Sequence, residues 1–383
     1  MTMSYRKFGK LDWNTSVLGF GCMRLPTVDG NANGPNINEA EAVRMIHHAM
    51  DRGVNYFDTA YIYHEGNSES VLGRALCGRR DRVKIATKSP LWLLQREEDF
   101  DRILNEQLRK LQTDYIDFYL LHGMDKQRWN ETVPKFKLLE KSEAAIRDGR
   151  IRHLGFSFHD DYAAFEKVVN GYDRWQFCQI QYNYMDTESQ AGTRGLQLAA
   201  GKGLAVVIME PLLGGRLARP PAAIRQVIEN SAVKRTAADW ALQWLWDQPE
   251  VSVVLSGMSN LDQVNANLDS AARARSHSFQ ASDLKVIADL QQKYRERTAI
   301  PCTRCNYCMP CPNGVKIPIV FEIYNEAFLH EDIPGSRFKY QIFIPEAGRA
   351  NICVACHNCE DACPQKIPIS EWMPRVHALL GAA

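Results

Sequence analysis

Residues 15–275 repeat one pattern eight times: a short apolar run followed by a longer amphipathic segment. Apolar residues at helical spacing predict helices over 39–52, 102–111 and 135–147, whereas the short apolar runs are typical of strands. The predicted strands are residues 16–21, 55–60, 83–88, 115–122, 151–157, 177–183, 204–211 and 251–257. Eight strands alternating with helices predict an α/β protein whose parallel sheet closes into a (β/α)8 TIM barrel.

An open, doubly wound parallel sheet is the alternative fold. It would be expected to carry a Gly-x-Gly-x-x-Gly turn after its first strand, where glycines let the backbone approach a dinucleotide. The residues at that place are Gly19-Phe-Gly21-Cys-Met-Arg24, which do not supply such a turn. The closed barrel is therefore favoured for residues 1–290, and residues 291–383 are predicted to form a second, smaller domain.

Eight of the eleven cysteines lie in two runs near the end of the chain. They are Cys302, Cys305, Cys308 and Cys311 in the first run, and Cys353, Cys356, Cys359 and Cys363 in the second. Such tight spacing in a long chain indicates metal or cluster ligation, because disulfide scaffolds spread their cysteines through small secreted domains. The other three, Cys22, Cys77 and Cys178, are predicted to be small core residues.

The second run has the spacing C-x2-C-x2-C-x3-C-P, which is typical of a [4Fe–4S] ligand loop whose fourth cysteine ligates another cluster. The first run has one residue fewer before its last cysteine. Both runs continue alike, over 311–319 and 363–369, which indicates an internal duplication. Two alternatives stay open at this point: a pair of zinc sites, and a single cluster held by the second run alone.

Composition excludes some classes of partner. The formal net charge of +1 gives no general attraction to nucleic acid or to an anionic membrane. The longest apolar runs, such as 204–209, are too short to cross a bilayer, and the first sixteen residues lack the pattern of a signal peptide. We therefore expect a cytoplasmic protein in a reducing compartment.

Four ionisable residues follow or end the predicted strands: Asp58, Tyr63, Lys88 and His122. Active groups of such barrels lie at the carboxyl ends of the strands. A phenol with a pKa of about 10 is a poor acid at neutral pH, but a neighbouring ammonium lowers that pKa. Tyr63 is thus predicted to donate a proton to a carbonyl oxygen, with Asp58 fixing Lys88 and His122 orienting the substrate.

Several segments containing these residues resemble the aldo-keto reductase family. They are residues 53–63, 84–88, 114–122, 149–157 and 179–183, in the family's order. The resemblance implies that Asp58, Tyr63, Lys88 and His122 form a catalytic tetrad. It also implies an oxidoreductase that transfers a hydride between a nicotinamide dinucleotide, usually NADPH, and a small aldehyde or ketone.

The resemblance further implies a set of cofactor-binding residues. They are Gly21, Met23, Asp58, Ser157, Gln181, Met209, Pro211, Leu212, Gly214, Gly215, Ser256, Gly257, Gln263 and Asn267. The match is uneven, because Phe158, Met209 and Glu210 replace the family's usual asparagine, aromatic residue and serine. Gln263 stands where NADP-preferring members often have arginine, so the contact with a 2′-phosphate is weaker and NADH is also possible.

The tail resembles the helical type of two-cluster ferredoxin module, with a helix over 321–329 followed by a loop-like segment, 332–337. This resemblance implies crossed ligation. One cluster would take Cys302, Cys305, Cys308 and Cys363, and the other Cys353, Cys356, Cys359 and Cys311. A ferredoxin- or flavodoxin-like electron partner would then be expected. The alternative function is an iron–sulfur electron-transfer or redox-sensing subunit that binds nucleotide without carbonyl turnover.

Overall fold

The structure is a computed structural model in which residues 2–329 and 332–382 are described. The chain divides into two compact units. The first contains Met1–Pro211 and Ala241–Ser278, and the second contains Leu212–Trp240 and Phe279–Ala383. The second unit therefore includes a segment from the middle of the sequence as well as the cysteine-rich tail.

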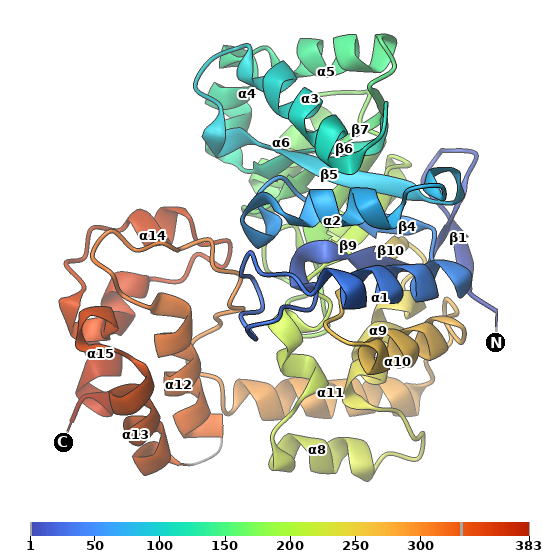
Figure 1. The fold of residues 1–383 in the computed structure, drawn as a ribbon. Coiled ribbons are helices and arrows are strands. Elements are labelled where there is room, and N and C mark those ends of the chain that lie inside the picture. Colours follow the sequence, from blue (N-terminus) through green and yellow to red (C-terminus); the bar gives the residue numbers. More distant parts are fainter. Residues whose placement is uncertain (1, 330–331, 383) are drawn as a thin grey trace. The chain divides into compact units, whose positions relative to one another are not determined.

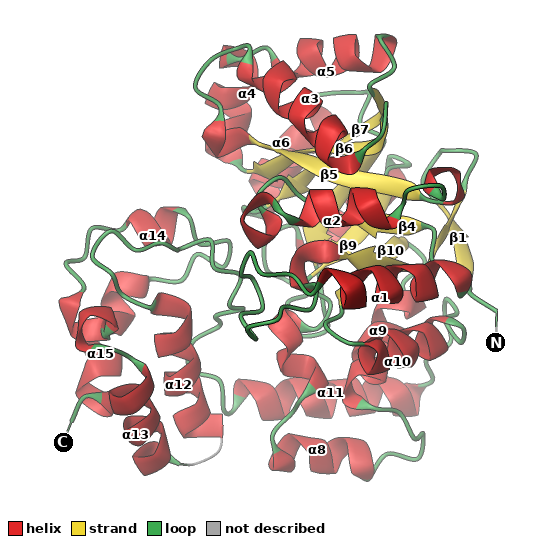
Figure 2. Cartoon of the chain, viewed as in Figure 1, coloured by secondary structure: helices red, strands yellow, loops and turns green. Residues whose placement is uncertain are grey.

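The first unit holds a closed barrel of eight parallel strands (Figures 1 and 2). In chain order they are β3 (Leu18–Gly21), β4 (Tyr56–Asp58), β5 (Lys84–Pro90), β6 (Ile116–Met124), β7 (Ile151–Phe158), β8 (Phe177–Gln181), β9 (Ala205–Met209) and β10 (Val251–Gly257). Pairing of β10 with β3 closes the barrel. The predicted (β/α)8 fold is confirmed, and each predicted strand overlaps an observed one.

Helices follow most of the barrel strands. They are α1 (Glu39–Asp51), α2 (Ser68–Ala75), α3 (Asp99–Leu111), α4 (Val133–Lys135), α5 (Leu138–Arg147), α6 (Tyr162–Asn170), α7 (Gly192–Gly201), α9 (Ala237–Asp247) and α10 (Leu261–Ala271). Short turns of other helix types are η1 (Cys22–Arg24), η2 (Tyr63–Gly66), η3 (Arg80–Arg82), η4 (Leu91–Leu93) and η5 (Arg128–Thr132). The predicted helix over 135–147 is wrong in one respect. Lys137 has a positive φ of 50°, which separates α4 from α5.

A short hairpin, β1 (Tyr5–Lys7) and β2 (Asn14–Ser16), precedes the barrel and was not predicted. Between its strands, Phe8 is fully buried and packs against Tyr56, Phe118 and Phe177. These rings belong to a cluster of buried residues supplied by six of the barrel strands. The hairpin therefore adds an aromatic residue to the barrel core.

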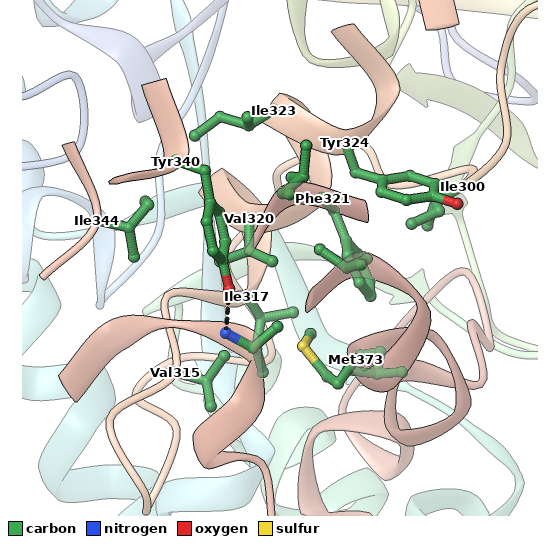
Figure 3. Close-up of a cluster of buried hydrophobic side chains, with 14 of the residues drawn as sticks. Ile300, Val315, Ile317, Val320, Phe321, Ile323, Tyr324, Tyr340, Ile344 and Met373 are labelled. Atoms are coloured by element: carbon green, nitrogen blue, oxygen red, sulfur yellow. Dashed lines mark hydrogen bonds between the residues drawn. The ribbon is translucent and has the colours of Figure 1, made fainter. Parts of the chain in front are cut away.

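The second unit is helical. Its elements are η6 (Leu213–Ala218), α8 (Ala222–Glu229), α11 (Ala281–Arg295), α12 (Ile317–Leu329), α13 (Ile333–Phe343), η7 (Glu346–Gly348), η8 (Ala350–Ile352), α14 (Asn358–Asp361) and α15 (Ile369–Leu380). Buried side chains from α12, α13 and α15 form its core, shown in Figure 3. Within that core the hydroxyl of Tyr340 accepts a hydrogen bond from the backbone N–H of Ala350 at 2.7 Å.

The segment 332–337, predicted to be a loop, instead begins α13. The Asp332 side chain accepts a hydrogen bond from the backbone N–H of Gly335 at 2.8 Å, and Pro334 occupies the first turn. Both features start helices, because a cap satisfies a free N–H and proline needs none there. The same residues are common in turns, which explains the error. In the described part of the chain, no helix has the length and apolar character needed to cross a membrane.

Candidate active site and cysteine sites

Three of the four predicted catalytic residues lie on neighbouring strands at one end of the barrel. Asp58 is the last residue of β4, Lys88 lies near the end of β5, and His122 lies near the end of β6. The register pairs Asp58 with Ala86 and His122 with Pro90, so the three residues lie at similar heights. Tyr63 follows β4 and begins η2.

Lys88 is held by two oxygen atoms. Its Nζ donates hydrogen bonds to Oδ1 of Asp58 at 2.6 Å and to the carbonyl oxygen of Thr59 at 2.7 Å. Lys88 and Asp58 are 1% and 3% exposed. The same Nζ lies 5.0 Å from the centre of the Tyr63 ring. The structure therefore brings a buried ammonium group close to the half-buried phenol.

His122 completes this group of side chains. Its ring centre lies 6.4 Å from that of Tyr63, with the two planes nearly perpendicular, and 4.9 Å from that of Trp92. Burial, followed by the charge of Lys88, lowers the pKa of His122 well below its usual value. The imidazole is therefore neutral at physiological pH, and a neutral imidazole can donate one hydrogen bond.

The expectation that Lys88 lowers the pKa of Tyr63 is not met in the protein alone. Burial raises this pKa well above its ordinary value, and the charges of Asp58 and Glu210 raise it further. Burial also raises the pKa of Asp58, although Lys88 opposes the rise. The prediction failed because the burial of the Tyr63 phenol depends on the folded structure and has no pattern in the sequence.

A buried network behind Lys88 was not predicted. Gln107 donates from Nε2 to Oε1 of Glu69 at 2.7 Å and to the carbonyl oxygen of Lys88 at 3.1 Å. The hydroxyl of Tyr119 donates to Oε1 of Gln107 at 2.7 Å. The hydroxyl of Thr87 donates to Oε1 of Glu69 at 2.6 Å. These hydrogen bonds fix the backbone of β5 at Lys88. The four residues come from different elements, so no sequence spacing relates them.

Most of the predicted cofactor residues in the first unit lie at the last or next-to-last position of a strand, as Gly21, Met209 and Gly257 do. Several are buried, namely Ser157, Gln181, Ser256 and Asn267. Their polar groups already have partners. Ser157 Oγ accepts from Gly123 N–H at 2.8 Å, Gln181 Nε2 donates to Asp186 at 2.8 Å, and Asn267 donates to Ser256 at 2.9 Å.

Gln263 lies in the first turn of α10, where its side-chain oxygen accepts from the backbone N–H of Ser259 at 2.8 Å. Met23 lies in η1. Pro211 ends the first segment of the barrel unit, whereas Leu212, Gly214 and Gly215 belong to the second unit.

The two glycines of that loop, Gly214 and Gly215, have positive φ values of 65° and 92°. A Cβ atom at Gly215 would have no neighbour within 4 Å. The backbone there is open, as an approaching phosphate group would require, and the positive φ is what demands glycine.

The eight tail cysteines line two separate spaces. Cys302, Cys305, Cys308 and Cys363 line the first, and Cys311, Cys353, Cys356 and Cys359 line the second. The fourth cysteine of each run thus joins the other run's group. No set of three or more histidine, cysteine or acidic side chains in the described ranges is arranged to hold a single metal ion.

The two cysteine spaces are neighbours. Ile317 and Ile369, the first residues of α12 and α15, line both of them. Exposure differs between the groups, because Cys363 is buried whereas Cys356 is exposed.

The three cysteines outside the tail also differ in exposure. Cys22 and Cys178 are buried as predicted, but Cys77 is exposed after α2, so its prediction as a core residue is wrong.

Two family models match the chain. The model of the aldo/keto reductase family matches residues 17–287, and the model of a 4Fe-4S dicluster domain matches residues 301–367. An uncharacterized oxidoreductase, YqkF of Bacillus subtilis, is 27% identical over 304 residues, covering 71% of this chain and 92% of the relative. The 6-dehydroglucose reductase of Novosphingobium aromaticivorans is 27% identical over 277 residues, covering 66% of this chain and 86% of the relative.

Among solved structures, the holo form of aldo-keto reductase AKR11C1 from Bacillus halodurans superposes with a TM-score of 0.61 at 28% identity. The match covers 75% of this chain and 96% of that one. Together with the closed barrel and the cysteine groups, these matches define a barrel oxidoreductase with a C-terminal iron–sulfur domain. The chain belongs to the aldo/keto reductase family.

Proposed function

We propose that the protein reduces a small aldehyde or ketone with a nicotinamide dinucleotide, and that Tyr63 is the general acid. One observation carries the proposal: the ammonium group of Lys88, bonded to Asp58 at 2.6 Å, lies 5.0 Å from the Tyr63 ring. A buried positive charge at that place stabilises the phenolate that Tyr63 becomes when its proton leaves.

Each residue of the tetrad then has a role. The raised pKa keeps the proton on Tyr63 until a carbonyl oxygen gains negative charge and can accept it. Lys88 stabilises the resulting phenolate, and Asp58 with the Thr59 carbonyl holds Lys88 in place. His122, which is neutral, donates a hydrogen bond to the same carbonyl oxygen.

The dinucleotide supplies the hydride when it is bound. Ser157 and Gln181 would hold its carboxamide, and the backbone of Gly214 and of Gly215, which is open at Gly215, would approach its pyrophosphate. Ser256, Gly257, Gln263 and Asn267 would bind the adenosine end. NADPH is the default by family, and NADH remains a candidate because Gln263 offers no guanidinium to a 2′-phosphate.

Replacement of Tyr63 by phenylalanine tests the catalytic role. Carbonyl-dependent oxidation of NADPH or NADH, followed by absorbance, should fall by about 10² to 10⁴-fold in Tyr63→Phe, the usual contribution of a general acid. Binding of the dinucleotide should change little. The matched control is Tyr61→Phe, because Tyr61 donates its hydroxyl hydrogen to Glu106 outside the tetrad. Equal rates for wild type and Tyr63→Phe would contradict the proposal.

We also propose that the tail holds two [4Fe–4S] clusters by crossed ligation. Each cysteine group surrounds a space, and each draws three thiols from one run and one from the other. A reducing compartment such as the cytoplasm would keep these thiols available. Iron and sulfide analysis after anaerobic purification should give about eight irons per chain. About four would indicate one cluster, and zinc would overturn the assignment.

The second candidate function is electron transfer or redox sensing without carbonyl turnover. The exposure of Cys356 and of Val354, which is 64% exposed, favours it, because a ferredoxin- or flavodoxin-like partner could approach the second cluster there. Reoxidation of a reduced carrier by the holoprotein, together with equal rates for wild type and Tyr63→Phe, would favour this function over the first.

A further inference from the structure

From Leu212 onward, the loop that follows β9 belongs to the same compact unit as the cysteine-rich tail. It forms η6 and leads into α8, which packs beside α11 (Figure 1). Its two glycines are the ones proposed above for the pyrophosphate. The residue directly after them is Arg216.

Arg216 is bonded at two points within this unit. Its Nη1 donates a hydrogen bond to the carbonyl oxygen of Cys302 at 2.7 Å, and its own carbonyl oxygen accepts one from the Tyr294 hydroxyl at 3.2 Å. Tyr294 is buried in α11. Arg216 is thus joined by its side chain to the first cysteine of the tail and by its backbone to a helix.

Cys302 lines the first cysteine space. A cluster bound at this space would fix Cys302 and, through its carbonyl oxygen, would fix Arg216 and the two glycines before it.

We propose that Arg216 is a positioning residue that couples the first cluster to the dinucleotide loop, an inference that rests on the proposed function. Two consecutive glycines make a loop flexible, and ordering it on binding weakens affinity. Anchoring of Arg216 removes part of that loss before the dinucleotide arrives. The coupling is reciprocal in binding free energy, so a bound dinucleotide should also act on the first cluster.

The test compares dinucleotide affinity in anaerobically purified wild type, Arg216→Gln and Arg216→Lys. The dissociation constant for NADP⁺, measured by calorimetry, should rise about tenfold in Arg216→Gln, which is about 1.4 kcal/mol. Arg219→Gln is the matched control, because it removes an equal charge from an exposed arginine at the end of the same loop. Its affinity should equal that of wild type.

A spectroscopic measurement separates coupling from a local structural effect. In wild type, NADP⁺ should shift the EPR signal of the first reduced cluster, identified as the signal that Cys308→Ser loses. In Arg216→Gln the same addition should leave the signal unchanged. If the Arg216 variants lose iron, Tyr294→Phe replaces them, since it removes the hydroxyl that donates to the Arg216 carbonyl and should raise the dissociation constant in the same direction.

The outcomes distinguish this inference from the proposed function. Wild type that binds no nicotinamide dinucleotide would refute both. The coupling alone would be refuted if wild type binds the dinucleotide but binding causes no EPR shift. The dissociation constants of Arg216→Gln and Tyr294→Phe would in that case lie within twofold of the wild-type value. A tenfold loss of affinity and a lost EPR response, with unchanged iron content, would support it.

Discussion

Lys88 and Asp58 form an ion pair that is almost fully removed from water. Burial of two charges is costly, and their attraction offsets that cost only with good geometry and additional hydrogen bonds, which the Thr59 carbonyl supplies here. Such a pair adds little net stability. The pair matters because it keeps the positive charge of Lys88 next to Tyr63.

Removal of one partner should therefore lower the free energy of unfolding far more than removal of both. Lys88→Met leaves Asp58 buried without its partner and should lower the free energy of unfolding by about 3–5 kcal/mol. The double variant Asp58→Asn, Lys88→Met should recover most of that loss. Urea denaturation of the three proteins measures this. A double variant as unstable as the single one would show that the pair contributes to stability directly.

The helices α2 and α3 approach closely at Gly73. A Cβ atom on Gly73 would lie 2.4 Å from the carbonyl oxygen of Lys110, a backbone atom that cannot move alone. The register of these helices matters for the site, because α2 carries Glu69 and α3 carries Gln107, which together fix the backbone at Lys88.

Gly73→Ala should therefore destabilise the barrel by about 1–3 kcal/mol through overpacking. Gly201→Ala is the control, because a Cβ atom there meets nothing within 4 Å and the residue ends α7. That change should be neutral or stabilising by up to about 1 kcal/mol. Thermal unfolding compares the two. Equal midpoints would mean that the contact between α2 and α3 relaxes freely.

The sequence predicted the elements whose signal is local. Strands such as β6 and β10 are mostly apolar, and α1 has an asparagine cap before it and a glycine after it. The break at Lys137 and the start of α13 were missed because their residues suit both helix and turn. In the site, the positions of residues at the strand ends predicted that Asp58, Lys88 and His122 lie close together. Neither the hydrogen bonds of Gln107 nor the raised pKa of Tyr63 corresponds to a pattern of neighbouring residues in the sequence.

At the scale of the whole chain, the predicted division at residue 290 stays a proposal, and that position falls within α11. The compact units divide the chain differently, since residues 212–240 group with the tail. No composition change marks that segment, because its assignment depends on contacts between distant parts of the sequence. The crossed grouping of the cysteines likewise depends on the fold of α12 and α15.

Crossed ligation predicts which cluster each terminal cysteine serves. Cys363→Ser should perturb the cluster held by Cys302, Cys305 and Cys308, although it lies in the other run. Cys311→Ser should perturb the other cluster. EPR of the reduced proteins, with Cys308→Ser and Cys356→Ser as references, assigns the signals. If Cys363→Ser resembled Cys356→Ser, each run would hold its own cluster.

The source of the hydrogen on the product carbon shows whether the dinucleotide transfers a hydride to the carbonyl. The holoprotein would be given an aldehyde and a reduced nicotinamide dinucleotide that carries deuterium at the transferred position of C4. The product would be examined by mass spectrometry. Hydride transfer from C4 should give an alcohol with one deuterium on its carbinol carbon, formed at least a hundredfold more slowly by Tyr63→Phe. An alcohol carrying only solvent hydrogen there, or dinucleotide oxidation without any alcohol, would contradict it.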